Sequence, residues 1–180
     1  MPLDGMADID SLFDQLRAAK EQPIGDWQPR RIVELDIEVD AAGQWRHQGS
    51  GFQRQAIVKL FATVLRREGE EFFLVTPAVK YRIRVADAPF LAVEMQVRAT
   101  AGGQDLYFRT NMDEVVRADR RHPLFVAAAR DRAEQYPYIA VRAGLHARIT
   151  RPVYYQLAEL AEPSGGAYLL RSAGQVFRLG

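Results

Sequence analysis

Apolar and polar residues alternate along three stretches of the chain, a period typical of strands with one buried face. In the first, from Val33 to Asp40, every second residue is acidic. Basic residues alternate with apolar ones from Val79 to Val85, and the same period recurs from Leu91 to Val97. We therefore expect three half-buried strands, and the acids of the first strand can face the bases of the second across a sheet.

Other segments space their apolar residues at intervals of three and four, which predicts amphipathic helices. The first spans about residues 8–21. The second begins at Ser50, which has capping-box spacing with Gln53, and ends at Gly69. A third begins at Pro152, because proline suits the first turn of a helix. The pattern thus mixes strands and helices.

The chain also contains an internal repeat. The segment Arg54–Leu60 resembles Arg151–Leu157, with arginine on arginine and leucine on leucine. Further on, Phe72–Leu74 corresponds in order to Tyr168–Leu170. Because repeats decide architecture, we interpret the chain as a duplication.

The fold class that follows is α+β, with two structurally related halves, each a small antiparallel sheet with a packed helix. The segment Ala86–Pro89 separates the repeated patterns. We therefore place an N-terminal α+β domain at residues 1–85, with its leading helix at about 8–21, and a C-terminal α+β domain at residues 86–180.

Composition narrows the classes of function. The 180 residues carry a formal net charge of only +1, which argues against nucleic-acid binding. The absence of cysteine excludes disulfides, zinc–thiolate sites and cysteine nucleophiles. The acidic start lacks the pattern of a signal peptide, and no segment approaches the roughly 20 apolar residues that span a bilayer. We expect a cytoplasmic protein without membrane contact.

A series of short motifs follows in order along the chain: Trp27-Gln28-Pro29, Gly43-Gln44-Trp45, Leu74-Val75-Thr76-Pro77, Asp87-Ala88-Pro89-Phe90, Phe108-Arg109-Thr110-Asn111, His122-Pro123-Leu124 and Arg151-Pro152-Val153. Together these motifs resemble the bacterial family catalogued as domain of unknown function 1285. The resemblance covers nearly the whole chain from Trp27 onward, and it implies a duplicated α+β architecture whose C-terminal half is superficially similar to pleckstrin-homology folds. It also implies a role in signal transduction, with a nucleotide-like ligand at a surface between the domains.

Three candidate ligand-binding residues lie in the first half. Arg54 stands at the start of a helix, where the helix dipole disfavours a cation unless an anion or an acid compensates it. The alternative is a structural ion pair of Arg54 with Asp36 or Asp87, or simple exposure. Thr76 and Lys80 flank a turn that can present a hydroxyl and an ammonium, or can be an ordinary turn with an exposed lysine.

Three more candidates are consecutive in the second half. Arg109, Thr110 and Asn111 end a strand beside an expected helix start, a common location for ligand-facing polar groups. Asn111 has Glu114 three residues later, so it can instead cap a short helix. The basic cluster from Arg117 to His122 is an alternative surface for a partner.

Catalytic and metal-binding patterns do not emerge from the sequence. The spacing of the three histidines is not that of metal ligands, and the GxSxG, P-loop and GxGxxG patterns do not occur. We therefore assign no catalytic residue, metal or cofactor and expect a protein that is not an enzyme. The predicted function is binding of a small anionic, nucleotide-like ligand near the junction of the halves. The alternatives are a protein–protein interaction module and a hydrolase that uses carboxylates.

Overall fold

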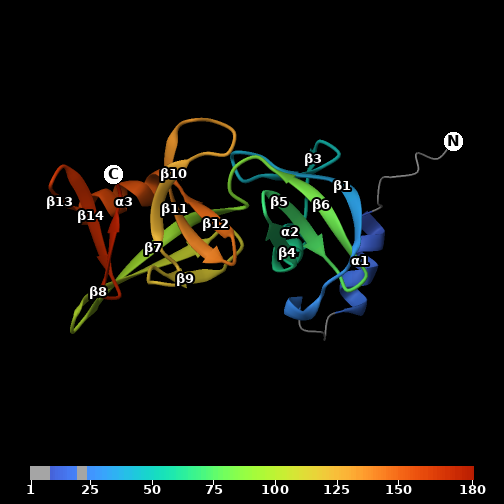
Figure 1. Cartoon of the computed structure of the whole chain (residues 1–180), viewed down its shortest axis with the longest axis horizontal. Helices are drawn as coiled ribbons and strands as arrows, with labels where there is room; N and C mark the ends of the chain where they lie inside the picture. Colours follow the sequence, from blue (N-terminus) through green and yellow to red (C-terminus); the bar gives the residue numbers. More distant parts are fainter. Residues whose placement is uncertain (1–8, 20–23) are drawn as a thin grey trace. The chain divides into compact units, whose positions relative to one another are not determined.

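The chain folds into two compact units, Met1–Ala86 and Asp87–Gly180 (Figure 1). The structure, a computed structural model, describes residues 9–19 and 24–180. Each unit contains one six-stranded sheet, and helices are few. The expected α+β class with two related halves is confirmed.

The sheet of unit 1 has the strand order β3-β2-β1-β6-β5-β4. Neighbouring strands are antiparallel except β1 and β6, which run parallel at the centre. Apolar side chains of β1 and β6, such as Leu35, Ile37 and Ile83, are buried in the core. The strands are β1 (Arg31–Val39), β2 (Trp45–His47), β3 (Ser50–Gly51), β4 (Leu65–Glu68), β5 (Glu71–Val75) and β6 (Val79–Val85).

The outer face of this sheet carries the charge pairing that the alternating sequence predicts. Arg82 on β6 pairs with Glu34 on β1, and Arg84 lies 2.7 Å from Asp36 and 3.8 Å from Glu38. These are exposed or half-buried ion pairs, so each contributes little free energy. Their effect is to favour one register between β1 and β6, because a slip by one residue would bury the charges.

Two helices accompany the sheet of unit 1. Helix α1 (Ile9–Ala18) buries Leu12 and Leu16, and the ring of Phe13 lies 5.3 Å from that of Phe61. The ends expected near residues 8 and 21 lie outside the described part of the chain. Helix α2 (Gln55–Thr63) buries Val58, Phe61 and Ala62. A short 3₁₀ turn, Ile24–Asp26, precedes β1.

The predicted second helix was too long at both ends. Ser50 does not cap it, because Ser50 and Gly51 form β3 and pair with β2. After Thr63 the chain turns into β4, which pairs with β5. Gly69, at a φ of 60°, closes the β4–β5 hairpin and does not end a helix. Strand pairing of Leu65 with Leu74 therefore outweighs the helical spacing of the same apolar residues.

Unit 2 contains a sheet of order β10-β11-β12-β7-β8-β9. Here too the neighbours are antiparallel except for one central pair, β12 and β7. Fully buried Phe90, Leu106, Phe108 and Ile139 belong to its core. The strands are β7 (Phe90–Thr100), β8 (Gly103–Thr110), β9 (Val115–Arg117), β10 (Leu124–Ala128), β11 (Gln135–Arg142) and β12 (Leu145–Ile149).

The two sheets share one topology. When the six strands of each sheet are numbered along the chain, both sheets have the order third, second, first, sixth, fifth, fourth. In each, the first and sixth strands form the parallel pair. Strands β10, β11 and β12 are therefore the counterparts of β4, β5 and β6.

The sequence repeat that pointed to the duplication matched the wrong elements. It aligned α2 with helix α3 (Arg151–Leu160), yet α2 lies between the third and fourth strands, whereas α3 follows the sixth. It also aligned β5 with strand β14 (Ala167–Ser172), which belongs to a separate sheet. The likeness between these segments is that of two amphipathic helices, each followed by antiparallel strands.

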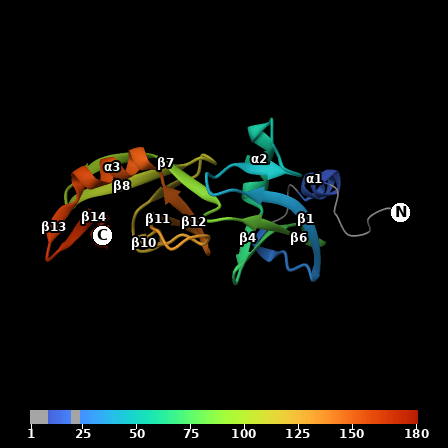
Figure 2. The same cartoon turned by 90° about the horizontal axis from the view of Figure 1, so that it is seen from above.

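The chain ends in this separate three-stranded sheet, β13-β14-β15. Helix α3 starts at Arg151, so Pro152 lies in its first turn as the sequence predicts. The helix buries Val153 and Leu157. It packs against β7 (Figure 2). Strands β13 (Glu162–Ser164) and β15 (Gln175–Arg178) flank β14.

Candidate functional site

Arg54 immediately precedes α2 and is exposed. No side chain caps this helix, and its first turn contains no acidic residue. The ion pairs predicted as an alternative are not formed, because Asp36 pairs with Arg84, and Asp87 pairs with Arg148. Within residues 9–19 and 24–180, the guanidinium of Arg54 has no hydrogen-bond or ion-pair partner, although the Arg54 carbonyl accepts the N–H of Ile57 at 3.1 Å. Its charge at the positive end of the helix dipole is therefore uncompensated by protein groups.

Thr76 is completely buried, and its hydroxyl already has partners. The oxygen lies 2.6 Å from Gln15 Oε1 and 2.8 Å from the carbonyl oxygen of Val79, and it accepts the N–H of Val79 at 3.0 Å. Gln15 also donates to the hydroxyl of Tyr81 at 2.6 Å. These bonds fasten α1 to the β5–β6 turn, so the side chain of Thr76 has a structural role.

Lys80 follows the same turn and faces the outer side of the sheet. Its ammonium pairs with Glu68 and lies 4.7 Å from the ring centroid of Phe73. Only 16% of the side chain is exposed. Lys80 therefore covers Phe73 with its stem and cation, an arrangement stabilised by a cation–π contact.

The three candidates of unit 2 lie around the β8–β9 turn. Arg109 bonds to Glu94 at 2.6 Å and to Asp113 at 3.0 Å. The hydrogen bond to Glu94, more than that to Asp113, raises the pKa of the Arg109 guanidinium. The Thr110 hydroxyl accepts N–H groups of Met112 and Glu114, both at 3.2 Å. The turn therefore holds the Thr110 hydroxyl, and Glu94 of β7 together with Asp113 of the turn holds the Arg109 guanidinium.

Asn111 does not cap a helix, because residues 111–114 form this turn and continue into β9. Its Oδ1 accepts the N–H of Leu91 at 3.0 Å, and its own N–H donates to the Leu91 carbonyl at 2.9 Å. Asp113 adopts a φ of 62°, which reverses the chain there. Asn111 thus ties the β8–β9 turn to the start of β7.

The structure brings the candidates together only in part. Thr76 and Lys80 bracket one hairpin of unit 1, and Arg109, Thr110 and Asn111 surround one turn of unit 2. The prediction that the two sets share a single ligand stays a prediction. Of the six, Arg54 alone combines exposure with the lack of a partner among the described residues.

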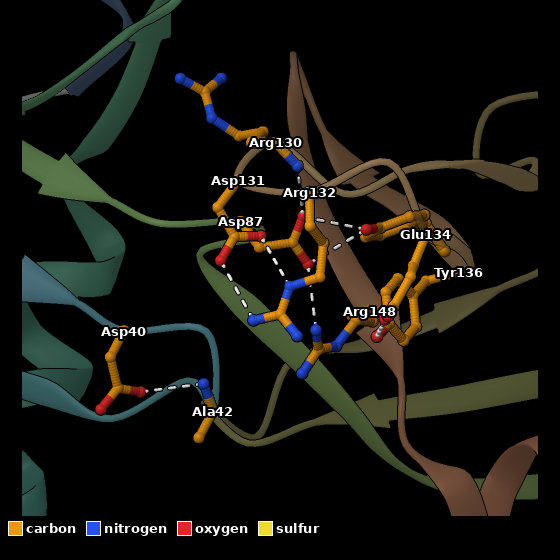
Figure 3. A network of polar contacts seen from close by, with 10 residues as sticks. Asp40, Ala42, Asp87, Arg130, Asp131, Arg132, Glu134, Tyr136 and Arg148 are labelled. Carbon is orange, nitrogen blue, oxygen red and sulfur yellow. Dashed lines mark hydrogen bonds and ion pairs between the residues drawn. The ribbon is translucent and has the colours of Figure 1, made fainter.

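A buried polar network surrounds Asp87 (Figure 3), and the sequence did not predict it. Both carboxylate oxygens accept the hydroxyl of Tyr138, at 2.9 and 3.1 Å. One oxygen also accepts the backbone N–H of Arg130 at 3.2 Å, and the other lies 3.4 Å from Arg148 Nη1. The side chain of Asp87 is 4% exposed. A single acid within Asp87-Ala88-Pro89-Phe90, an otherwise apolar segment, was the available signal.

The network is closed and suits anchoring better than proton transfer. Burial, followed by the hydrogen bond to Asp87, raises the pKa of the Tyr138 hydroxyl well above its ordinary value. The Arg148 guanidinium also lies 5.0 Å from the ring centroid of Tyr136 (Figure 3). The turn after β10 is thereby held against the first residue of unit 2, and the tyrosine stays protonated at neutral pH.

Only Arg117 of the basic cluster from Arg117 to His122 forms side-chain ion pairs among the described residues, whereas Arg120 and Arg121 are exposed. Arg117 lies 3.3 Å from both Asp105 and Asp119. Burial by itself would raise the pKa of Asp119, but the N–H groups of Arg121 and His122 and the Arg117 guanidinium together lower it. This pairing offsets the charge of Arg117, while the exposed Arg120 and Arg121 can still contact a partner.

Two surface hollows are lined by residues of unit 2. The larger, about 520 Å³, lies among the β7–β8 turn, the end of α3 and the β14–β15 hairpin, with Gln104, Glu162, Arg171 and Gln175 in its wall. The other, about 410 Å³, is lined by Leu124 to Val126 of β10 together with residues near the C-terminus. The larger one has the more polar side chains, so it is the better candidate for a polar ligand.

Across residues 9–19 and 24–180, no cluster of three or more His, Asp or Glu side chains is arranged to hold a metal ion. Among the helices of the described chain, none is both long and apolar enough to cross a membrane.

Comparison with known proteins identifies relatives of both units. Residues 22–88 match the domain described as "Domain of unknown function (DUF1285), N-terminal domain", and residues 89–179 match "Protein of unknown function (DUF1285), C-terminal domain". No curated protein matches the chain.

Two crystal structures are similar to the chain. A DUF1285 family protein from Silicibacter pomeroyi DSS-3 is 37% identical, with a TM-score of 0.83 over 93% of each chain. A DUF1285 family protein from Shewanella baltica OS155 is 27% identical, with a TM-score of 0.53 over 69% of this chain and 91% of that one. With both domains matched and a relative of this identity along nearly the full length, the chain belongs to the DUF1285 family.

Proposed function

We propose that this protein binds a small anionic, nucleotide-like ligand and that Arg54 is its main contact. The observation that carries the proposal is the uncompensated cation at the start of α2. Free N–H groups at a helix start attract anions, and an adjacent arginine adds charge-assisted hydrogen bonds. Thr76, Lys80, Arg109, Thr110 and Asn111 have partners within the protein, so their contribution to binding is indirect.

Aromatic rings close to Arg54 support a ligand with a base. Phe52 lies two residues before Arg54 and is half-buried. Its ring stacks on that of His47, with 6.2 Å between centroids and 21° between planes. Nucleotide bases stack on such rings. A phosphate at Arg54 and a base near Phe52 would occupy neighbouring positions along the chain.

Binding is tested by isothermal titration calorimetry with ATP, GTP and inorganic tripolyphosphate. We expect ATP or GTP to bind more tightly than tripolyphosphate, since only the nucleotides offer a base. Arg54→Ala should weaken binding by roughly 10- to 100-fold, the size of a lost charge-assisted hydrogen bond. Arg31→Ala is the matched control, because Arg31 is also exposed, lies in unit 1 and has a side chain without a partner among the described residues.

The proposal fails if none of the three compounds binds, or if Arg54→Ala and Arg31→Ala bind equally well. We further propose that the role is signalling in the cytoplasm, so the bound nucleotide should be released unchanged. Chromatography of ATP after prolonged incubation with the protein checks this. Hydrolysis by the purified chain would instead favour the carboxylate hydrolase among the earlier alternatives.

A protein–protein interaction module is the less favoured alternative function. Arg117 pairs with Asp105 and Asp119, although Arg120 and Arg121 of the same cluster are exposed and have no side-chain partner among the described residues. An acidic partner that used Arg117 would have to break these pairs. Anion binding at Arg54 is preferred because Arg54 also lies at the positive end of a helix dipole, beside free N–H groups.

A further inference from the structure

Hydrogen bonds hold the segments that line the larger hollow of unit 2 in place. Gln104 Nε2 donates to the Arg171 carbonyl at 3.1 Å, and the N–H of Ala173 donates to the Gln104 carbonyl at 3.1 Å. Ser172 is completely buried, donates to the Ala118 carbonyl at 2.7 Å and accepts the N–H of Leu106 at 2.9 Å. These bonds join the C-terminal hairpin to the main sheet, so the hollow persists without a ligand. Its volume of about 520 Å³ lies within the usual range for small-molecule sites.

Two opposite charges stand side by side in the wall of this hollow. Arg171 Nε lies 3.5 Å from Glu162 Oε2, and the side chains are 60% and 66% exposed. A long, exposed ion pair of this kind is weak, so a ligand can replace it at little free-energy cost. Both groups keep donors or acceptors beyond the one contact between them.

We propose that this hollow binds a free α-amino acid with a polar side chain. The ammonium and carboxylate of an amino acid are attached to one carbon, so they match an acid and a base that are themselves adjacent. Glu162 would bind the ammonium and Arg171 the carboxylate. The amides of Gln104 and Gln175 then face the ligand's side chain, while Leu160 contacts its methylene groups.

The chemistry of the wall excludes other classes of ligand. Glu162 repels a ligand that carries only negative charge, such as a nucleotide. The charged ends of an unblocked dipeptide are separated by a peptide unit, so they do not both reach neighbouring groups. This site lies within unit 2 and is independent of Arg54 in unit 1.

One glycine in the wall offers a way to block the hollow. A Cβ at Gly102 would meet no atom within 4 Å, and its φ lies outside the left-handed region. Gly102→Leu should therefore fill space without straining the turn. Gly103 and Gly174 are unsuitable, because their φ values of 132° and 72° favour glycine.

The test is a titration followed by two-dimensional amide NMR, with each standard amino acid added separately at millimolar concentration. We expect at least one polar amino acid to give saturable shifts at Gln104, Arg171 and Gln175. Its N-acetyl and carboxamide derivatives, each lacking one charge, should bind at least about tenfold more weakly. Glu162→Gln, Arg171→Gln and Gly102→Leu should each abolish the shifts, whereas Glu159→Gln, an exposed acid on α3, should not.

The inference is overturned if no amino acid gives saturable shifts at these amides. It is also overturned if the blocked derivatives bind as well as the free amino acid, or if binding survives Gly102→Leu. Arg54→Ala serves as a cross-check, since it should leave amino-acid binding unchanged while it weakens nucleotide binding. The two proposals can therefore fail separately.

Discussion

Replacing Asp87 by alanine removes the acceptor around which a corner of unit 2 is built. The hydroxyl of Tyr138, the N–H of Arg130 and the guanidinium of Arg148 would all lose a partner. The Tyr138 side chain is buried, so water cannot readily replace the lost bond. We expect unit 2 to become less stable and the turn that follows β10 to loosen.

The size of the loss follows from burial and geometry. Breaking a buried ion pair by removing one member costs about 3–5 kcal/mol. Here Asp87 is 4% exposed but Arg148 is 20% exposed, and the two are 3.4 Å apart. The lower end is therefore appropriate, and we expect about 3 kcal/mol for Asp87→Ala. Asp87→Asn, which retains an acceptor for Tyr138, should lose less than half of this.

The two tryptophans provide a convenient internal reference. Trp27 and Trp45 both belong to unit 1, so their fluorescence reports its unfolding in urea. Far-UV circular dichroism reports both units, and the two signals need not coincide in a two-domain chain. Asp87→Ala should shift the circular-dichroism transition to lower urea and leave the tryptophan transition in place.

Asp131→Ala is the matched control. Asp131 forms an exposed ion pair with Arg132 in the same corner of the fold, at 3.2 Å. Its removal should leave both transitions where they are. Equal effects of Asp87→Ala and Asp131→Ala, or a loss below about 1 kcal/mol for Asp87→Ala, would refute the view that the network anchors unit 2.

Three further perturbations have defined outcomes. The pKa of Tyr138 is raised in the folded protein, so its contribution to the stability of unit 2 is intact below about pH 10 and is lost as pH rises further. Urea midpoints measured from pH 8 to 11 should therefore fall less steeply in Tyr138→Phe than in the unmodified protein. Thr76→Val should destabilise unit 1 by about 1–3 kcal/mol in the tryptophan-detected transition, and Thr76→Ser should recover most of it by keeping the hydroxyl. Leu157→Ala leaves a cavity under α3 and should cost about 2–5 kcal/mol by circular dichroism, whereas Tyr155→Ala, on the exposed side of α3, should have little effect.

Local periodicity anticipated the elements better than their ends. The alternation in β1 and β6 identified half-buried strands, and Pro152 located the start of α3 within one residue. In β7 the alternation identified a strand but the wrong buried face, because Val93 and Val97 are exposed and Ala92 is buried. Gly69 misled the interpretation of α2, because glycine at positive φ serves a hairpin as well as a helix end. Asn111 suggested the start of a short helix where the chain forms the β8–β9 turn, because asparagine suits turns and helix caps alike.

The candidate site was likewise predicted from the sequence only in part. Sequence reasoning selected Arg54 from the conflict between its charge and the helix dipole, and the structure leaves that charge unpaired among the described residues. It could not reveal that Thr76 bonds to Gln15 or that Arg109 pairs with Glu94. Both interactions join residues that are distant along the chain. Nor could it reveal the Glu162–Arg171 hollow, because its lining residues come from segments distant along the chain: the β7–β8 turn, α3, β13 and the β14–β15 hairpin.

What the sequence by itself determined is the α+β class and the charged face of the first sheet. Each depends on residue types at fixed local spacing, and local spacing sets which side of a strand or helix is apolar. Tertiary structure alone decided that both sheets share one strand order and that Asp87 meets Tyr138. Those outcomes depend on which strands pair, and pairing is selected by the burial of side chains from the whole unit.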